Sequence, residues 1–278
     1  MKRPGGLDRE AIDADQLQKL RRLIDALVPC NRFYTTKLTE VGLDRELPSL
    51  AQFTARMPFT VKDELLADQH DEPPYGSNLT YPLERYTRFN QTSATADRPL
   101  RWLDTPESWD WMLDNWARVF AAAGVRPGDR MFFAFSFGPF LGFWTAFEAA
   151  LRQQVLCIPG GGMSSAARLQ AILDNHATIL CCTPTYAIRL GQVAAEQNID
   201  LGSAQVHRII VAGEPGGSVP ATRAAIERFW PKGRVFDQHG MTEVGPVTFQ
   251  NPHHPDILHV METAYLAEVI DPATRQAV

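Results

Sequence analysis

The sequence predicts an α/β fold, in which a multilayered, largely parallel β-sheet is flanked by helices. Beyond Thr92, short apolar segments of strand length alternate with segments whose apolar residues recur at helical spacing. These strand-like segments are continuously apolar, which is typical of parallel strands that are buried on both faces. The composition agrees, because 45% hydrophobic and 21% charged residues allow a full globular core and argue against disorder.

The 278 residues are enough for one large domain or two small ones. We expect residues 1–90 to form helices and loops packed on a core made by residues 91–278. A helix ending near Pro29 is indicated by the apolar residues Leu17, Leu20, Ile24, Leu27 and Val28. The stretch 41–86 is interrupted by prolines and short charged segments, so it predicts small helices and loops.

A longer helix is predicted to begin at Thr105 and Pro106, where a capping hydroxyl precedes a proline in the first turn. Its end is indicated by Gly124. Its apolar stripe consists of Trp109, Met112, Leu113, Trp116, Val119 and Phe120. Tryptophans at this spacing favour a core-facing surface over a cofactor site.

Five predicted strands follow, each but the last leading into a helix. The strands are Met131–Phe137, Val155–Ile158, Thr178–Cys182, Arg208–Val211 and Arg234–Phe236. The helices run through Ala150, over 164–175, to about Glu196 and over 220–230. In parallel α/β sheets ligands bind beyond the carboxyl ends of the strands. Two polar segments, Ala212–Pro215 and His239–Glu243, occupy such positions and are therefore candidate binding loops.

Composition and charge exclude several classes of function. The net charge of −5 and pI near 5.8 argue against a nucleic-acid partner, which requires a basic face. No apolar run reaches the length of a membrane span, and no secretory signal pattern is present. The four cysteines lack metal-ligand spacing, and the adjacent Cys181 and Cys182 are expected to be buried free thiols. Without a signal peptide, a reducing cytoplasm is the expected location.

The segment Phe236–Glu243 concentrates chemistry that suits a nucleotide. It places a histidine ring, Gly240, the Thr242 hydroxyl and the Glu243 carboxylate within a few residues. Glycine lets the backbone approach a ligand, threonine donates to phosphate oxygens, and glutamate suits Mg²⁺. Taken alone, the segment is equally well explained as a polar turn after a strand. A second segment, Gln91–Pro99, is rich in hydroxyls and has the matching chemistry for phosphate.

Together the two segments resemble the adenylate-forming superfamily, and within it the phenylacetate–CoA ligase-like branch. The resemblance covers nearly the whole chain, in order and with matching spacing. Its other segments are Phe33–Leu38, Leu50–Phe53, Met57–Asp63, Cys182–Ala187, Ala212–Pro215 and Glu268–Thr274. It implies an AMP-forming acyl- or aryl-CoA ligase. In such an enzyme a carboxylate attacks the α-phosphate of ATP, and the thiol of CoA then attacks the acyl-adenylate.

The resemblance implies roles for individual residues. Glu243 corresponds to the magnesium-binding glutamate and Thr242 to the residue that contacts the α-phosphate. His239 replaces the tyrosine that lies against adenine, and its smaller face is expected to reduce nucleotide affinity. The adenine-side loop is Gly213, Glu214 and Pro215. Asp237 either accepts a hydrogen bond from the adenine amine or caps a nearby backbone amide.

The phosphate loop departs from the superfamily's Thr-Ser-Gly-Thr-Thr-Gly-Lys-Pro-like pattern. Its hydroxyl donors are Thr92, Ser93 and Thr95. Arg98 stands for lysine, while Ala94 and Asp97 stand where the pattern has glycine. A left-handed alanine costs about 1–2 kcal/mol. A carboxylate about 4 Å from a phosphate charge costs on the order of 4 kcal/mol at an effective dielectric of about 20. We therefore expect impaired ATP binding unless Asp97 turns to solvent.

An apolar substrate pocket is expected from Phe135, Phe137, Phe140 and Tyr186, with Gly160 and Gly161 lining the acyl or CoA channel. Each of these residues is equally well explained as plain core or as a turn. The glycines of 160–162 also allow a dinucleotide site, and hence an oxidoreductase, but they lack a clear acidic residue about 20 positions on. The cluster His253, His254 and His259 allows a metal site, without a nearby cysteine.

In this superfamily the turn at 271–274 is followed by more of the large domain and by a small mobile domain that carries a catalytic lysine. The resemblance therefore implies an incomplete large domain, and an incomplete or impaired enzyme. The implied cofactors are ATP, Mg²⁺ and CoA, and the implied substrate is an aromatic or apolar carboxylic acid. The alternative is a non-catalytic nucleotide- or acyl-binding remnant of such a ligase.

Overall fold

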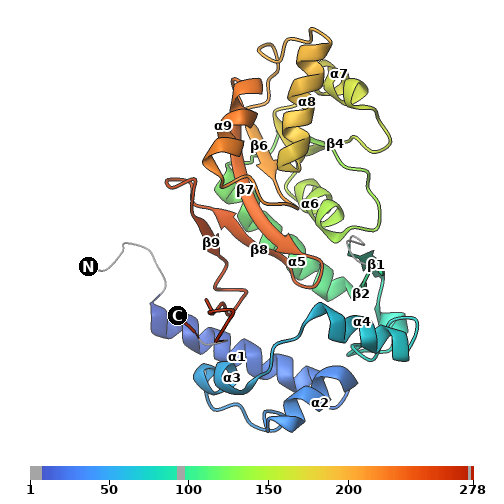
Figure 1. Ribbon diagram of the computed structural model, residues 1–278, viewed down its shortest axis with the longest axis vertical. Coiled ribbons are helices and arrows are strands. Elements are labelled where there is room, and N and C mark those ends of the chain that lie inside the picture. The colour runs from blue at the N-terminus through green and yellow to red at the C-terminus, as the bar shows by residue number, and fades with distance from the viewer. Residues whose placement is uncertain (1–7, 93–97, 275–276) are drawn as a thin grey trace. The chain divides into compact units, whose positions relative to one another are not determined.

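The computed structural model describes residues 8–92, 98–274 and 277–278, and Figure 1 shows its helices and strands. The chain forms two compact units. The first comprises Met1–Pro106 with Glu262–Val278, and the second comprises Glu107–Met261. None of the described helices combines the length and the apolar character needed to cross a bilayer.

The first unit is mainly helical. Its helices are α1 (Arg9–Leu27), α2 (Arg32–Glu40), α3 (Leu50–Arg56), α4 (Lys62–Asp71) and the 3₁₀ turn η1 (Leu83–Arg85). A small core is made by Ile24, Leu38, Leu43 and Leu47. A two-stranded antiparallel hairpin, β1 (Arg88–Gln91) and β2 (Arg101–Asp104), flanks the candidate phosphate loop.

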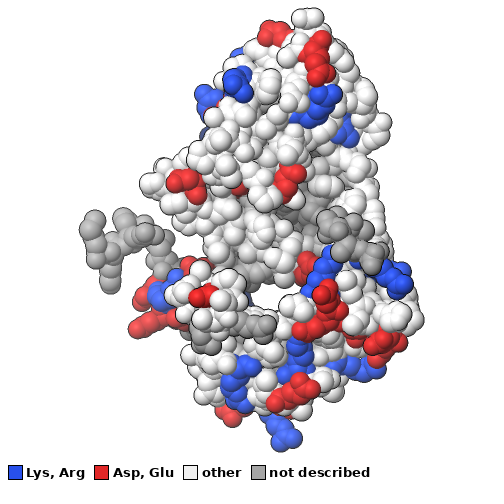
Figure 2. All heavy atoms as spheres, in the orientation of Figure 1, with Lys and Arg blue, Asp and Glu red and all other residues white. Residues whose placement is uncertain are grey.

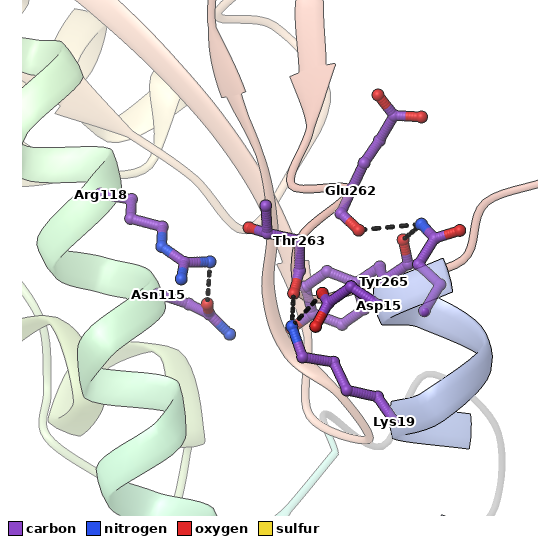
Figure 3. Close-up of polar contacts among 8 residues, drawn as sticks. Asp15, Lys19, Asn115, Arg118, Glu262, Thr263 and Tyr265 are labelled. Carbon is purple, nitrogen blue, oxygen red and sulfur yellow. Dashed lines mark hydrogen bonds and ion pairs between the residues drawn. The ribbon is translucent and has the colours of Figure 1, made fainter. Parts of the chain in front are cut away.

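The C-terminal segment is fastened to α1 by polar contacts within the same unit. The side-chain amide of Gln16 donates to the carbonyl oxygens of Glu262 at 2.8 Å and Tyr265 at 3.0 Å (Figure 3). Lys19 donates to the carbonyl oxygen of Thr263 at 2.7 Å. Because Gln16 is almost fully buried, these bonds satisfy an amide that would otherwise destabilise the fold.

The second unit contains a seven-stranded sheet with the order β4-β3-β5-β6-β7-β8-β9. The strands are β3 (Arg130–Phe133), β4 (Leu156–Pro159), β5 (Ile179–Cys182), β6 (Arg208–Val211), β7 (Arg234–Met241), β8 (Gly245–Gln250) and β9 (Leu258–Val260). Strands β3 to β7 pair in parallel, and β8 and β9 continue the sheet in antiparallel pairing. The predicted α/β fold with a largely parallel sheet is therefore confirmed.

Helices cover both faces of this sheet. They are α5 (Pro106–Ala123), α6 (Leu141–Arg152), α7 (Ser165–Asp174), α8 (Pro184–Glu196) and α9 (Pro220–Phe229). On one face, α7, α8 and α9 enclose a core that includes Leu169, Leu190, Trp230 and the strand residues Val211 and Val235. On the other face, α6 packs on β3, where the rings of Phe133 and Phe147 meet edge to face with centroids 5.0 Å apart.

Helix α5 packs against α6 through two tryptophans. The indole N–H of Trp109 donates to Glu148 at 2.8 Å, and that of Trp116 donates to Thr145 at 2.9 Å. The predicted tryptophan stripe is therefore a core-facing stripe, as expected. Each large apolar side chain buried in such layers contributes about 1.5–3 kcal/mol. Because helices pack on both faces of the sheet, the sheet holds the loops at its carboxyl edge in place.

Two strand boundaries differ from the prediction. β3 ends at Phe133, short of the predicted Phe137, because the chain turns out of the sheet and Phe137 takes a left-handed backbone with φ of 53°. β7 extends beyond the predicted Phe236 to Met241. Its extension is stabilised by pairing with β8, a partner that local sequence does not reveal.

Candidate nucleotide-binding site

The motif at 236–243 lies on a β-hairpin at the carboxyl edge of the parallel sheet (Figure 1). β7 runs parallel to β6 as far as Asp237 and then pairs antiparallel with β8. The motif was expected to be a loop after a short strand, and this expectation is wrong for its first half. Only Thr242, Glu243 and Val244 form the turn. The candidate α-phosphate and magnesium residues therefore lie at a hairpin tip.

The hairpin requires its glycines. A Cβ at Gly240 would lie 2.6 Å from the carbonyl oxygen of Gly245 and 3.0 Å from the Cα of Pro246, which a real side chain does not tolerate. The register shifts between His239 and Gly240, so the strand bulges there. His239 is exposed, while Thr242 and Glu243 are half-buried. The bulge and the tight turn together fix where these three side chains leave the backbone.

Asp237 ties the hairpin to the loop after β6. Its carboxylate accepts a hydrogen bond from the Ser218 hydroxyl at 2.7 Å, and its backbone N–H donates to the side chain of Gln250 at 3.1 Å. A Cβ at Gly217 would lie 2.3 Å from the Asp237 carboxyl carbon, so the loop passes very close to this residue. Burial raises the pKa of Asp237, although the bonds from Ser218 and the charge of Arg223 oppose this effect.

Because the pKa of Asp237 is raised in the folded protein, the ionised form of Asp237 lowers the free energy of unfolding at neutral pH. This destabilisation disappears as the pH falls through the pKa. Asp237→Asn does not titrate. We therefore expect the melting temperature of this variant, relative to wild type, to be highest near about pH 7 and to decline toward about pH 4.5. Thermal unfolding of both proteins across this range is the measurement. The exposed carboxylate variant Asp114→Asn is the control, and a difference that is flat or rises on acidification would contradict the assignment.

The adenine-side loop at 213–215 is anchored to the start of α8. Gly213 takes a left-handed backbone with φ of 90°. The carboxylate of Glu214 accepts from the backbone N–H of Thr185 at 2.7 Å, in the first turn of a helix whose N-cap is Thr183. A carboxylate at this position is stabilised by the unpaired amides and by the helix dipole. The Glu214 side chain therefore anchors the loop to the first turn of α8.

The structure brings the three candidate phenylalanines together. Phe135 is buried and stacks on Phe143, with ring centroids 3.9 Å apart and planes 15° apart. Phe137 contacts Phe135 edge to face at 6.4 Å, and Phe140 contacts Phe143 edge to face at 6.0 Å. These rings lie on the α6 side of the sheet, just beyond the carboxyl end of β3.

Tyr186 lies on the opposite side of the sheet, against the core of α7, α8 and α9. Its hydroxyl is 3.0 Å from that of Ser165, and the buried guanidinium of Arg168 lies 5.0 Å from its ring centre. Arg168 also donates to the carbonyl oxygens of Gly160 at 2.9 Å and Phe135 at 3.3 Å. The structure therefore does not group Tyr186 with the phenylalanines, and Arg168 braces the segments between them.

The two glycines of the predicted channel differ. A Cβ at Gly160 would lie 2.8 Å from the Phe132 ring, so close packing requires this glycine. Gly161 is exposed, and a Cβ there would meet only ordinary contacts, the nearest being the Phe137 ring at 3.4 Å. Gly160 is explained by packing, whereas packing does not require a glycine at position 161.

Part of the candidate phosphate loop belongs to the described first unit. The Thr92 hydroxyl accepts from the backbone N–H of Leu100 at 3.0 Å and so closes the β1–β2 hairpin. Arg98 is exposed. The predictions for Ser93, Ala94, Thr95 and Asp97 lie outside the described residues.

The donor set at the hairpin tip fits a magnesium ion that a nucleotide brings with it. Mg²⁺ is usually held by one or two carboxylates, waters and substrate phosphates, so a single half-buried glutamate is adequate.

The histidines at 253–259 are a second candidate metal site in the sequence. Among the described residues, no group of three or more His, Cys, Asp or Glu side chains is arranged to hold a metal ion.

Sequence reasoning missed three residues at this edge: Ser218, Gln238 and Arg168. Ser218 could not be found because its partner Asp237 is distant in sequence. Arg168 lies in a predicted helix, where an arginine is ordinarily solvent-exposed, yet here it is buried. Gln238 carried a signal, because it is a polar residue in a segment whose neighbours at positions 235 and 236 are apolar.

Comparison with known proteins agrees with a nucleotide-binding site at this edge of the sheet. No model of a protein family matches the chain. Among curated proteins, a phenylacetate–CoA ligase of Thermus thermophilus is 26% identical over 270 residues, which cover 96% of this chain and 59% of that ligase. A phenylacetate–CoA ligase of Aromatoleum evansii is 30% identical over 235 residues, covering 82% of this chain and 50% of the ligase. The chain thus spans between half and three-fifths of these relatives.

Solved structures of 2-hydroxyisobutyryl-CoA ligase are similar over the whole chain. An open conformation, in complex with 2-hydroxyisobutyryl-AMP and CoA, superposes with a TM-score of 0.90 at 25% identity, covering 100% of this chain and 67% of that one. The same ligase in its thioester-forming state gives a TM-score of 0.91 at 27% identity, covering 98% and 58%. The resemblance to adenylate-forming ligases of the phenylacetate–CoA ligase-like branch is therefore confirmed, and the chain has the fold of a large part of such a ligase.

Proposed function

We propose that this chain carries the adenylate-forming site of an AMP-forming acyl- or aryl-CoA ligase, which activates a carboxylic acid with ATP and Mg²⁺ and transfers the acyl group to CoA. Because the chain spans about 59% of the first of these relatives, the proposal concerns the activity to which these residues contribute. The proposal rests on a contact between two candidate binding elements. The Asp237–Ser218 hydrogen bond joins the motif hairpin to the loop that begins at Gly213.

The chain's own residues support specific parts of adenylation. The step needs charge stabilisation at phosphorus more than proton transfer. The Thr242 hydroxyl is proposed to donate to the α-phosphate, and Glu243 to hold the Mg²⁺ that neutralises phosphate charge. His239, exposed on β7, is proposed to lie against adenine. The backbone of 213–215 lines the adenine edge, and the roles of Thr92, Ser93, Thr95 and Arg98 are predictions from the resemblance.

The thiol that receives the acyl group is proposed to be external. Burial raises the pKa of Cys157 to about 12, and it also raises those of Cys181 and Cys182. A thiol that is protonated at neutral pH is a poor nucleophile. The three cysteines of the second unit are therefore unsuited to accepting an acyl group, which favours CoA. Free thiols also suit the reducing cytoplasm in which we place the reaction.

The acid is proposed to be mainly apolar or aromatic, because Phe135, Phe137, Phe140 and Phe143 gather on the α6 side of the carboxyl edge. The test is mass spectrometric detection of acyl-AMP from the purified chain with ATP, Mg²⁺ and a panel of aromatic and medium-chain acids. Acyl-AMP that depends on all four components is the expected result. Binding of AMP without acyl-AMP from any acid would instead favour the non-catalytic remnant.

A further inference from the structure

We infer that Gln238 selects acids whose acyl portion carries a hydrogen-bond donor, such as a hydroxyl or an N–H group. This inference rests on the proposed function and specifies the substrate class of the same site. It is carried by one buried, unpartnered acceptor, by the face of the sheet on which that acceptor lies, and by the aromatic side chains that share the face.

The side chain of Gln238 is 5% exposed, and its Oε1 atom has no hydrogen-bond partner in the described part of the chain. A buried acceptor without a donor has lost its hydration and gained nothing in exchange, so it destabilises the folded protein. A leucine of similar size would avoid this cost. Such groups in native proteins call for an explanation, and a ligand that brings the missing donor supplies one.

The face on which Gln238 lies follows from its neighbours on β7. Val235 packs in the core of α7, α8 and α9, and Asp237 contacts Gly217 and Ser218 on the same side. Successive side chains of a strand point to opposite faces. Phe236 and Gln238 therefore face the other side of the sheet, which α6 covers.

Several buried apolar side chains lie on the α6 side of the carboxyl edge. Phe135, two residues beyond the end of β3, stacks there on Phe143 of α6. Cys181 of β5 and Ile210 of β6 are buried, and they alternate with neighbours that belong to the opposite core. Gln238 follows at the same edge on β7. An apolar row with a buried acceptor at one end is complementary to an apolar acid with one donor group.

The alternation on β7 also separates the parts of an acyl-adenylate. Asp237 faces the loop at 213–218, where adenine is proposed to bind, and Gln238 faces the phenylalanines. The two residues are adjacent, and the hairpin tip with Thr242 and Glu243 lies just beyond them. The adenine and the acyl group of one ligand would therefore lie on opposite sides of β7, with the phosphate at the tip.

The test uses hydrolysis-resistant acyl-sulfamoyladenosines, in which a sulfamate replaces the phosphate of the acyl-adenylate. Calorimetry compares phenylacetyl-sulfamoyladenosine with its ortho-, meta- and para-hydroxyl, para-fluoro and para-methoxy derivatives on the 278-residue chain. We expect one hydroxyl isomer to bind about tenfold tighter than the unsubstituted compound. We expect Gln238→Leu to abolish this preference and to bind the unsubstituted compound at least as well as wild type does. The exposed substitution Gln197→Leu serves as the control and should retain the preference.

The outcomes separate the two proposals. If all the analogues bind through their adenosine but wild type and Gln238→Leu rank them identically, the inference about Gln238 is wrong and the proposed function stands. Preference for the methoxy derivative, which only accepts hydrogen bonds, would likewise overturn it. If no analogue and no AMP binds, the proposed function fails and takes the inference with it. Thermal unfolding adds an independent check, because Gln238→Leu removes an unpaired acceptor and should raise the melting temperature even as selectivity is lost.

Discussion

Replacing Ala94 and Asp97 together by glycine is expected to tighten ATP binding by between about tenfold and about a thousandfold, with a much smaller effect on AMP. The residues stand at two glycine positions of the superfamily's phosphate loop. The upper figure corresponds to a carboxylate about 4 Å from a phosphate charge at an effective dielectric of about 20, and solvent screening lowers it. ATP gains more because the repulsion involves its outer phosphates. Calorimetric titration of both nucleotides measures the difference.

Two further variants separate charge from backbone freedom. Asp97→Asn removes the charge and keeps the side chain, so it should account for most of the gain in ATP affinity. Ala96→Gly loosens the same loop without changing charge and should have little effect. Equal gains for ATP and AMP in the double glycine variant would show that this loop does not face the outer phosphates.

Glu243→Gln is expected to remove the magnesium dependence of nucleotide binding. Glu243 sits at the tip of the β7–β8 hairpin, half-buried, where its carboxylate can share a metal ion with phosphate oxygens. Wild type should bind ATP about tenfold or more tightly with Mg²⁺ than with chelator, whereas the variant should bind equally in both conditions. Calorimetry with and without the metal is the measurement.

The matched control is Glu196→Gln, which neutralises an exposed glutamate at the end of α8. It should leave the magnesium dependence as in wild type. If Glu243→Gln also retains that dependence, Glu243 is not a ligand, and the magnesium part of the proposed site must be sought elsewhere.

Much of the fold could be predicted because its signals are local. β5 and β6 are short, continuously apolar segments followed by helix-start residues, and β6 was predicted at its observed bounds, Arg208–Val211. Helix α5 begins at its proline as predicted. The extension of β7 was not predictable in this way. It contains Gly240 and polar residues that locally favour a loop, and it becomes a strand only because β8 pairs with it.

For the candidate site too, residues with a local signal could be predicted, and residues joined by long-range contacts could not. The motif residues at 239–243 and 213–215 were found from residue type and resemblance. The residues that fasten them, such as Ser218 and Thr185, are joined by contacts between distant segments and leave no local pattern. Charge was predictable in a coarse way. On the face drawn in Figure 2, acidic and basic side chains of the described residues are interspersed, in keeping with a net charge of −5.

The most direct measurement of the central claim is a calorimetric titration of the purified chain with phenylacetyl-sulfamoyladenosine, followed by the same titration with NADH. The proposed site joins adenine, phosphate and acyl contacts around one hairpin, so the acyl-adenylate analogue should bind one-to-one with a Kd of ~10 µM or tighter, whereas NADH should not bind. Binding of NADH without binding of the analogue would contradict the account and favour a dinucleotide site at the glycines of 160–162.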